Sequence, residues 1–380
     1  MRIIVLLLVA LITTPSLAGE RDGVARVVVV GDVHGDYKQF VRILRDIGVI
    51  DKRTRWRGGK THLVQIGDLP DRGPDTDRVI RMLKRLEKEA ERAGGEVHVL
   101  VGNHEAMVMR GDLRYVHPNE YAALTDNLSR ERQKRYYEKY VEWIKRSTPE
   151  DEWPEFNREY WREWSQRFPL GYTEHRQAWA PDGEFGGWVL QKDALLRIND
   201  SLFVHAGLDP SAEFQPMAVI NKAVRGELAN ARESDDESII NAADSPLWYR
   251  GLAVMPETDE NIALVDGLLD YYGVKRIIIG HTPLMGTILP RFGGRVLLTD
   301  VGMAEHYGSG RAALIIDQNE QTVVLGDVTL EMPAYGSGRD ALEDYLAAAK
   351  PLVSRPEKID RYLEKTRPEL INSSPDSGAQ

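Results

Sequence analysis

The stretch Val97-His98-Val99-Leu100-Val101-Gly102-Asn103-His104-Glu105 decides the fold of this chain. Its apolar, β-branched run ends abruptly at Gly102, which predicts a buried strand followed by a sharp turn. Asn103 and His104 would then lie in the crevice at the carboxyl end of the strand, where open α/β sheets bind ligands. An amide oxygen that can bind a hard cation therefore stands next to an imidazole that can carry a proton.

Four other predicted strands end in the same kind of residue, each with a glycine nearby. The strands cover residues 26–30, 61–66, 202–204 and 275–279, and the side chains that follow them are Asp32 with His34, Asp68, His205 and His281. Apolar residues at helical spacing separate the first three strands of the chain. Residues 25–105 therefore predict a β-α-β-α-β unit with a parallel sheet and right-handed crossovers.

The remaining chain is divided by composition. Residues 111–188 hold six of the eight tryptophans, and we expect a helical insert with its own small core, which is compatible with a cap over a substrate groove. Strands at 296–298, 312–316 and 322–325 favour an antiparallel second sheet. We expect one main domain over residues 25–333, short C-terminal helices over 334–366 and a disordered tail over 367–380.

Composition excludes several classes of protein. The 380 residues include no cysteine, so disulfides, thiolate metal ligands and phosphatases with a cysteine nucleophile are excluded. A net charge of −10 argues against nucleic acid as a partner. Any anionic ligand must therefore be held by a locally positive site.

Residues 1–18 are typical of a secretory signal peptide. Arg2 precedes an apolar stretch over residues 3–12, and Ser16-Leu17-Ala18 forms a small-x-small cleavage site. The alternative is a membrane anchor, but the apolar run is shorter than the ~20 residues that span a bilayer. We expect cleavage and export to the periplasm or the medium, without stable insertion in a membrane.

The strand-end residues form a plausible ligand set for two divalent metal ions. They are Asp32, His34, Asp68, Asn103, His205 and His281. Asp68 is the expected bridging carboxylate, because it follows the strand between the others. Mn²⁺ is the ion that we expect, and Fe, Zn and Co also suit oxygen and imidazole ligands. Two divalent cations and two ligating aspartates leave a net positive site, which would bind a phosphate dianion.

Other residues near these strand ends predict roles toward a phosphate ester. His104 could protonate the leaving oxygen, and Asp71 is placed to orient it. Arg72, Arg250 and Asn103 are the predicted phosphate-binding residues. His62, His98, His117 and His175 are interpreted as structural, and the roles of His306 and Tyr307 stay open.

Five motifs of this chain together resemble those of calcineurin-like metallophosphoesterases. They are Gly31-Asp32-Val33-His34-Gly35, Gly67-Asp68-Leu69-Pro70-Asp71-Arg72-Gly73, Gly102-Asn103-His104-Glu105, His205-Ala206-Gly207 and Gly280-His281. Within that family, the motifs resemble those of the phosphoprotein phosphatase branch, and the bacterial Shewanella-like phosphatases are the most similar group. The resemblance implies a four-layer α/β/β/α sandwich and a dinuclear site of manganese, iron or zinc. The chain departs from the family in Ala206, where a second glycine is usual, and lacks a Ser-Ala-Pro-Asn-Tyr loop.

The predicted function is a metal-dependent phosphoprotein phosphatase that hydrolyses phosphomonoesters by direct attack of a hydroxide bridging two metals. The resemblance to Shewanella-like phosphatases suggests phosphotyrosine as the substrate. One alternative is a nucleotide or dinucleoside polyphosphate hydrolase, which could use the same metal core. A non-catalytic phosphate- or metal-binding protein is the alternative of another class, and the presence of His104 and Asp71 argues against it.

Overall fold

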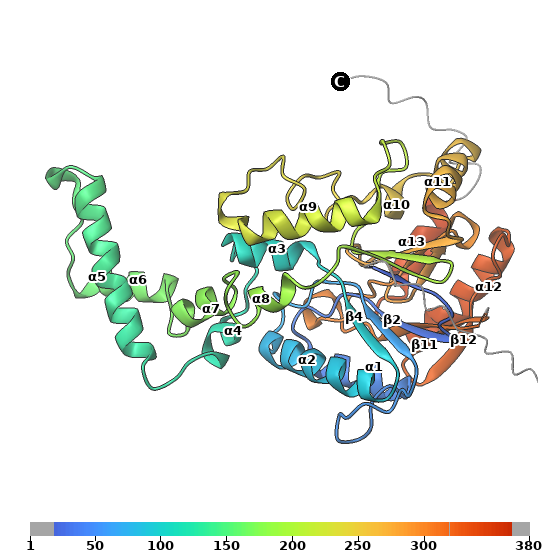
Figure 1. The fold of residues 1–380 in the computed structure, drawn as a ribbon, viewed down its shortest axis with the longest axis horizontal. Helices are drawn as coiled ribbons and strands as arrows, with labels where there is room; N and C mark the ends of the chain where they lie inside the picture. The colour runs from blue at the N-terminus through green and yellow to red at the C-terminus, as the bar shows by residue number, and fades with distance from the viewer. Residues whose placement is uncertain (1–18, 319, 367–380) are drawn as a thin grey trace, which may run out of the picture.

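Two six-stranded sheets face one another and carry helices on their outer faces (Figure 1). The computed structural model describes residues 19–318 and 320–366. Sheet I has the order β12-β11-β10-β2-β3-β4, and sheet II has the order β1-β5-β6-β7-β9-β8. α1 and α2 cover sheet I, and α9 and α11 lie on the opposite side of the molecule. This is the four-layer arrangement that the family resemblance implied.

Sheet I begins with the predicted β-α-β-α-β unit. Its strands β2 (Arg26–Val30), β3 (His62–Gln65) and β4 (Glu96–Val99) are parallel and are joined by α1 (Tyr37–Asp46) and α2 (Thr76–Arg92). Asp36 caps α1, since its carboxylate accepts the N–H of Gln39. The strands read as continuous apolar runs because both faces of sheet I are covered. Their carboxyl ends consequently point to one edge of the sheet.

The observed strand pairing contradicts the prediction of an antiparallel second sheet. β9 (Val296–Leu298) pairs parallel with β7 (Arg276–Ile279) in sheet II, whereas β10 (Ala312–Asp317), β11 (Glu320–Leu325) and β12 (Val328–Glu331) extend sheet I. β10 runs antiparallel to β2, with Leu314 opposite Val29. A short apolar run fits a buried strand of either sheet, so periodicity cannot choose the partner.

Sheet II also contains strands that the sequence reading did not identify. They are β1 (Glu20–Arg21), β5 (Leu195–Ile198) and β8 (Leu289–Arg291), alongside the predicted β6 (Ser201–Val204). β6, β7 and β9 are parallel, and the other strands close the two edges. The helices after β6 are α9 (Met217–Ala229), α10 (Gly251–Val254) and α11 (Asp259–Tyr272).

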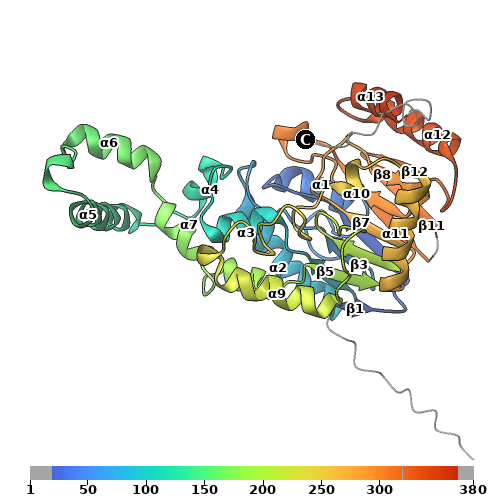
Figure 2. The ribbon, with the colours of Figure 1, turned by 90° about the horizontal axis from the view of Figure 1, so that it is seen from above.

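The tryptophan-rich insert contains α4 (Pro118–Ala123), α5 (Ser129–Ser147), α6 (Arg158–Arg167), α7 (Tyr172–Ala178) and α8 (Gly186–Val189), after α3 (Asn103–Arg110). α5 and α6 stand out from the body as an arm (Figures 1 and 2). Trp164 of α6 is buried in an aromatic cluster with Tyr137 and Phe168, at centroid distances of 5.0 Å to each. The insert therefore has a small core of its own, as predicted.

Two helices end the described chain, α12 (Arg339–Ala349) and α13 (Glu357–Lys365). Tyr345 of α12 donates its hydroxyl proton to the carbonyl of Ile288, which ties this helix to sheet II. Within residues 19–318 and 320–366, no helix is long and apolar enough to cross a bilayer. The predicted signal peptide, 1–18, and the predicted tail, 367–380, lie outside the described residues.

Candidate metal centre and phosphate pocket

The six predicted metal ligands meet where the carboxyl ends of both sheets come together. Asp32 and His34 follow β2, Asp68 follows β3, Asn103 opens α3 after β4, His205 follows β6 and His281 follows β7. All six side chains are buried. Sheet I and sheet II thus each supply part of the set, and residues 32 and 281 are brought together from opposite ends of the domain.

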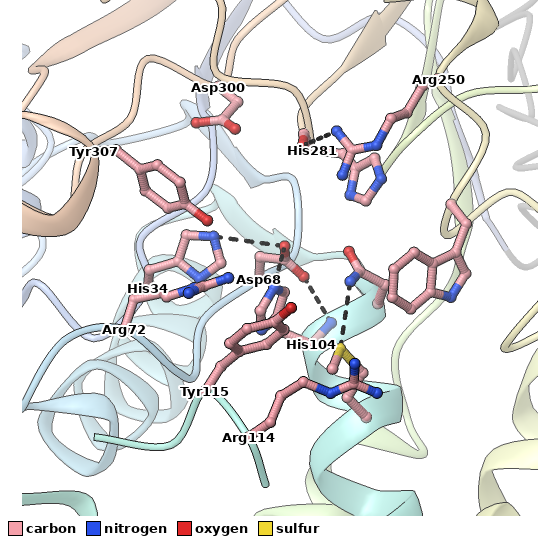
Figure 3. A pocket seen from close by; sticks show the side chains of 13 residues that line it. His34, Asp68, Arg72, His104, Arg114, Tyr115, Arg250, His281, Asp300 and Tyr307 are labelled. Atoms are coloured by element: carbon pink, nitrogen blue, oxygen red, sulfur yellow. Dashed lines mark hydrogen bonds and ion pairs between the residues drawn. The ribbon is translucent and has the colours of Figure 1, made fainter. Parts of the chain in front are cut away.

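Asp68 lies at the centre of this group (Figure 3). Its Oδ1 is 3.4 Å from Nε2 of His205, and its Oδ2 is 3.7 Å from Nε2 of His34. Possible ligand atoms of Asp68, His205 and His281 all lie within 4.8 Å of one another, and a second such group joins Asp68 to His34 and His104. Asp68 alone belongs to both groups, which is the position of a carboxylate shared by two metals.

Asn103 and Asp32 complete the set around these two groups. Oδ1 of Asn103 lies 3.0 Å from Nε2 of His205. Asp32 lies 4.0 Å from Nε2 of His34, and its two carboxylate oxygens accept the backbone N–H of His281 at 3.2 and 3.0 Å.

The electrostatics of the site fit a pair of cations. Burial lowers the pKa of His34 to about 3 and that of His281 to about 2, so both imidazoles are neutral and free to bind metal. Nε2 of His281 is buried and has no hydrogen-bond partner. Burial, Asp300 and Asp68 raise the pKa of Asp32 well above its usual range. A cation would remove this cost of burying carboxylates together.

Backbone strain is concentrated at the same place. His34, Asp68, Asp71, Arg72 and His281 all have positive φ, between 47° and 72°. A non-glycine residue in this region costs of order 1–3 kcal/mol, and such residues persist where their surroundings hold them. All of these residues except Asp71 line the pocket, and Asp71 contacts His104, which also lines it.

The glycines before the ligands allow close backbone approach. A Cβ at Gly102 would overlap Oδ1 and the amide nitrogen of Asp68, and a Cβ at Gly280 would overlap Oδ1 of Asp32. Both glycines are thus required by packing against another ligand.

Glu105 holds the turn that carries Asp68. Its buried carboxylate accepts the backbone N–H groups of Asp68 at 3.0 Å, Leu69 at 2.7 Å and Gly102 at 2.8 Å. The last of these bonds caps α3, and the other two join α3 to the loop after β3. Asp68 in turn accepts the N–H of His104 at 2.9 Å. These bonds fix the relative positions of the loop after β3 and the loop after β4.

His104 and Asp71 form a buried pair beside the predicted ligands. Nδ1 of His104 donates to Oδ2 of Asp71 at 2.5 Å, while Nε2 lies 3.9 Å from Oδ2 of Asp68. Burial alone would lower the pKa of His104, but Asp68 and Asp71 outweigh it and raise the pKa to about 9. His104 is therefore an imidazolium at neutral pH, which can donate a proton.

A cavity of about 190 Å³ opens onto His104, and cationic and aromatic side chains surround it. The guanidinium of Arg72 lies 3.6 Å from the ring centroid of Tyr115. Arg250 donates to the carbonyl of His281 at 3.0 Å and to Oγ1 of Thr282 at 3.1 Å. Figure 3 shows Arg72 and Arg250 on opposite sides of Asp68. Both predicted arginines thus line the same cavity.

Several pocket residues were missed by the sequence reading. Asp300 follows β9 and lines the cavity, so it shows the same strand-end pattern as the predicted ligands and could have been found by it. Arg114 and Tyr115 come from the start of the insert, where no periodicity marks them. Tyr307, whose role the sequence left open, lines the cavity with its ring 5.4 Å from His34, and His306 packs against it.

Comparisons with known proteins identify relatives of this chain. The family model described as calcineurin-like phosphoesterase matches residues 25–285. An uncharacterized protein of Schizosaccharomyces pombe is 33% identical over 77% of this chain and 78% of its own length. Shewanella-like protein phosphatase 2 of Arabidopsis thaliana is 29% identical over 75% of this chain and 73% of its own length.

A solved structure is similar over most of the molecule. The cold-active protein-tyrosine phosphatase of a psychrophilic Shewanella species shares 25% sequence identity and a TM-score of 0.63. The superposition covers 83% of this chain and 82% of that protein. The similarity extends beyond the motifs to the arrangement of both sheets.

Proposed function

This chain belongs to the calcineurin-like phosphoesterase family, and within that family we propose that it is a metal-dependent phosphoprotein phosphatase that prefers phosphotyrosine. The observation that carries the proposal is the buried His104–Asp71 pair, whose His104 lines the same cavity as Asp68 and the two arginines. The names of the relatives support the substrate class, since they include a protein phosphatase and a protein-tyrosine phosphatase.

Two divalent cations, when bound by the strand-end residues, polarise phosphoryl oxygens and lower the pKa of a water to roughly 7. Arg72 and Arg250 bind the remaining phosphate oxygens from two sides of the cavity. The stacking of Arg72 on Tyr115 fixes the plane of its guanidinium, so that little side-chain freedom is lost when phosphate binds.

His104 supplies the proton that the leaving group needs. Asp71 occupies Nδ1, so the proton on Nε2 is the one available to the leaving oxygen. Asp71 also keeps the ring in one orientation and stabilises its positive charge. An alkyl leaving group depends on this proton more than a phenol does, because an alkoxide is the stronger base.

The rim of the cavity favours an aromatic phosphoester. Tyr115, Tyr307 and Trp248 line it together with the arginines. An aryl group can lie against these rings, and offset or edge-to-face ring pairs contribute about 0.5–1.5 kcal/mol beyond burial. That range predicts a kcat/KM for a phosphotyrosine peptide that is up to about ten times the value for a phosphoserine peptide.

The test uses the full chain after metal removal and return of Mn²⁺. Phosphate release is measured from a phosphotyrosine peptide, from the matched phosphoserine peptide and from a dinucleoside tetraphosphate. We expect metal-dependent turnover that is highest for phosphotyrosine. Asp68→Asn should abolish it, whereas Asp77→Asn, a carboxylate change on α2, should not.

Two outcomes would overturn the proposal. Turnover of the dinucleotide alone would assign the chain to nucleotide hydrolysis. Metal bound at the expected stoichiometry without turnover of any of the three esters would make it a binding protein.

A further inference from the structure

A second group of metal-type side chains lies at the other end of sheet I, away from the phosphate pocket. His62 begins β3, Glu96 begins β4 and His98 is two residues further along β4. His62 pairs directly with Glu96 in the parallel ladder. Because side chains two apart in a strand point to the same face, all three lie on one face of the sheet.

The three side chains are already close enough to share an ion. Nδ1 of His62 lies 3.0 Å from Nε2 of His98, and Nδ1 of His98 lies 3.7 Å from Oε1 of Glu96. One possible ligand atom from each residue lies within 4.8 Å of those of the other two. Two ligand nitrogens on a tetrahedral Zn²⁺ are separated by about 3.3 Å, given bonds of about 2.0 Å. To bind one ion, these two nitrogens would separate by about 0.3 Å, and the Glu96 carboxylate, whose 3.7 Å contact is to Nδ1 of His98, would move toward the ion.

We propose that His62, Glu96 and His98 form a transition-metal site distinct from the catalytic centre, with Zn²⁺ as its ion. Two imidazoles and one carboxylate select zinc and similar metals over Mg²⁺ or Ca²⁺, which prefer oxygen ligands. With three protein ligands, the fourth position of the tetrahedron is left for water.

The protonation of the site suits metal binding. Burial lowers the pKa of His98 to about 4 and also lowers that of His62, so both rings are neutral at pH 7. The Arg21 side chain donates to both oxygens of Glu96, at 2.8 and 2.7 Å. Hydrogen bonds of this kind orient the carboxylate ligands of metal sites, and each oxygen keeps a further lone pair.

Two nearby cations, Arg21 and Lys192, act against a positive ion at the histidines, and each is paired with a carboxylate that offsets part of its charge. A cavity of about 180 Å³ reaches Glu96 and His98 and is also lined by Lys192. The ammonium of Lys192 is paired with Glu87 at 2.5 Å and lies over the ring of Trp188. The Glu87 carboxylate therefore offsets part of the Lys192 charge that acts on His98.

The site would join the two sheets at their open edge. Glu96 and His98 belong to β4, the edge strand of sheet I, while Arg21 belongs to β1, the edge strand of sheet II. An ion held by Glu96 would tie β3 to β4 and stabilise the Glu96–Arg21 contact between the sheets. We therefore expect zinc binding here to raise thermal stability without changing turnover.

The test counts zinc on three proteins: wild type, the double variant His62→Gln/His98→Gln, and His117→Asn. The last alters a histidine outside both clusters and keeps a capping side chain on α4. Each protein is saturated with Zn²⁺, freed of unbound metal and measured by atomic emission. We expect the double variant to hold one zinc fewer per chain and His117→Asn to match wild type. Turnover of the Mn²⁺-loaded double variant on p-nitrophenyl phosphate should stay within about twofold of wild type.

Equal zinc content in wild type and the double variant would overturn the proposal. Glu96→Gln keeps both imidazoles, and it should weaken zinc binding at this site by about tenfold or more. If the double variant fails to fold, wild-type crystals soaked in zinc decide the question by anomalous scattering. A peak between the three side chains supports the site, and its absence refutes it.

Discussion

Replacing Glu105 should destabilise the whole molecule, because three buried N–H groups depend on one carboxylate. In Glu105→Ala the amides of Asp68, Leu69 and Gly102 lose their acceptor. Each unpaired buried donor costs about 1–3 kcal/mol, so the sum is about 3–9 kcal/mol. Total unfolding free energies are about 5–15 kcal/mol, so this loss is a large part of the stability.

Glu105→Gln should have a smaller effect that the geometry also specifies. Its remaining oxygen can take the place of Oε2 and keep the bonds from Asp68 and Gly102, while its NH₂ group then faces the N–H of Leu69. One lost bond predicts a cost of about 1–3 kcal/mol. Burial and the charge of Asp68 raise the pKa of Glu105 to about 7, so pH 8.5 is the condition in which the wild-type carboxylate is ionised.

The assay is urea unfolding followed by tryptophan fluorescence, at pH 8.5 and with metal removed by EDTA. Removing metal separates the loss of hydrogen bonds from any loss of metal binding. Glu131→Gln, an exposed carboxylate on α5, should change the unfolding free energy by less than about 0.5 kcal/mol. An unfolding free energy of Glu105→Ala within about 1 kcal/mol of the wild-type value would refute this prediction.

Three further predictions test the proton donor, the metals and a buried histidine. His104→Asn should lower kcat by about 10²–10⁴ for an alkyl phosphate and much less for a phenol of low pKa, so an unchanged dependence of kcat on leaving-group pKa would contradict the proton-donor role. Mn²⁺ at 100 times its Kd should raise the unfolding free energy by about 2.7 kcal/mol per site, and Asp68→Asn should remove most of this gain in a thermal melt. Burial lowers the pKa of His175 to about 3 in the folded protein, so the unfolded chain takes up the proton first as pH falls below about 6.5. The unfolding free energy of wild type should therefore fall by up to about 1.4 kcal/mol per pH unit between pH 6 and 4, relative to that of His175→Phe. Urea midpoints of the two proteins that change in parallel across that range would disprove this prediction.

Much of the candidate site was accessible from the sequence because one local rule repeats. A buried strand that stops at a glycine and a polar residue places that residue at the carboxyl edge of its sheet. The rule found Asp68 and Asn103 in sheet I as well as His205 and His281 in sheet II. Applied to β9 it would also have found Asp300, which the reading did not use. Tyr115 carries no such signal, since its place in the pocket depends on where the insert leaves the body.

The sequence by itself determined most of the segments that become strands and helices, though not β1, β5 and β8, and it determined the polar residues that follow the predicted strands. Those properties follow from neighbouring residues through backbone sterics and the spacing of apolar side chains. The tertiary structure alone decided that β9 joins sheet II while β10 extends sheet I, and that Asp32 meets His281. Such pairings depend on free energy summed over contacts between distant segments, which no short window of sequence contains.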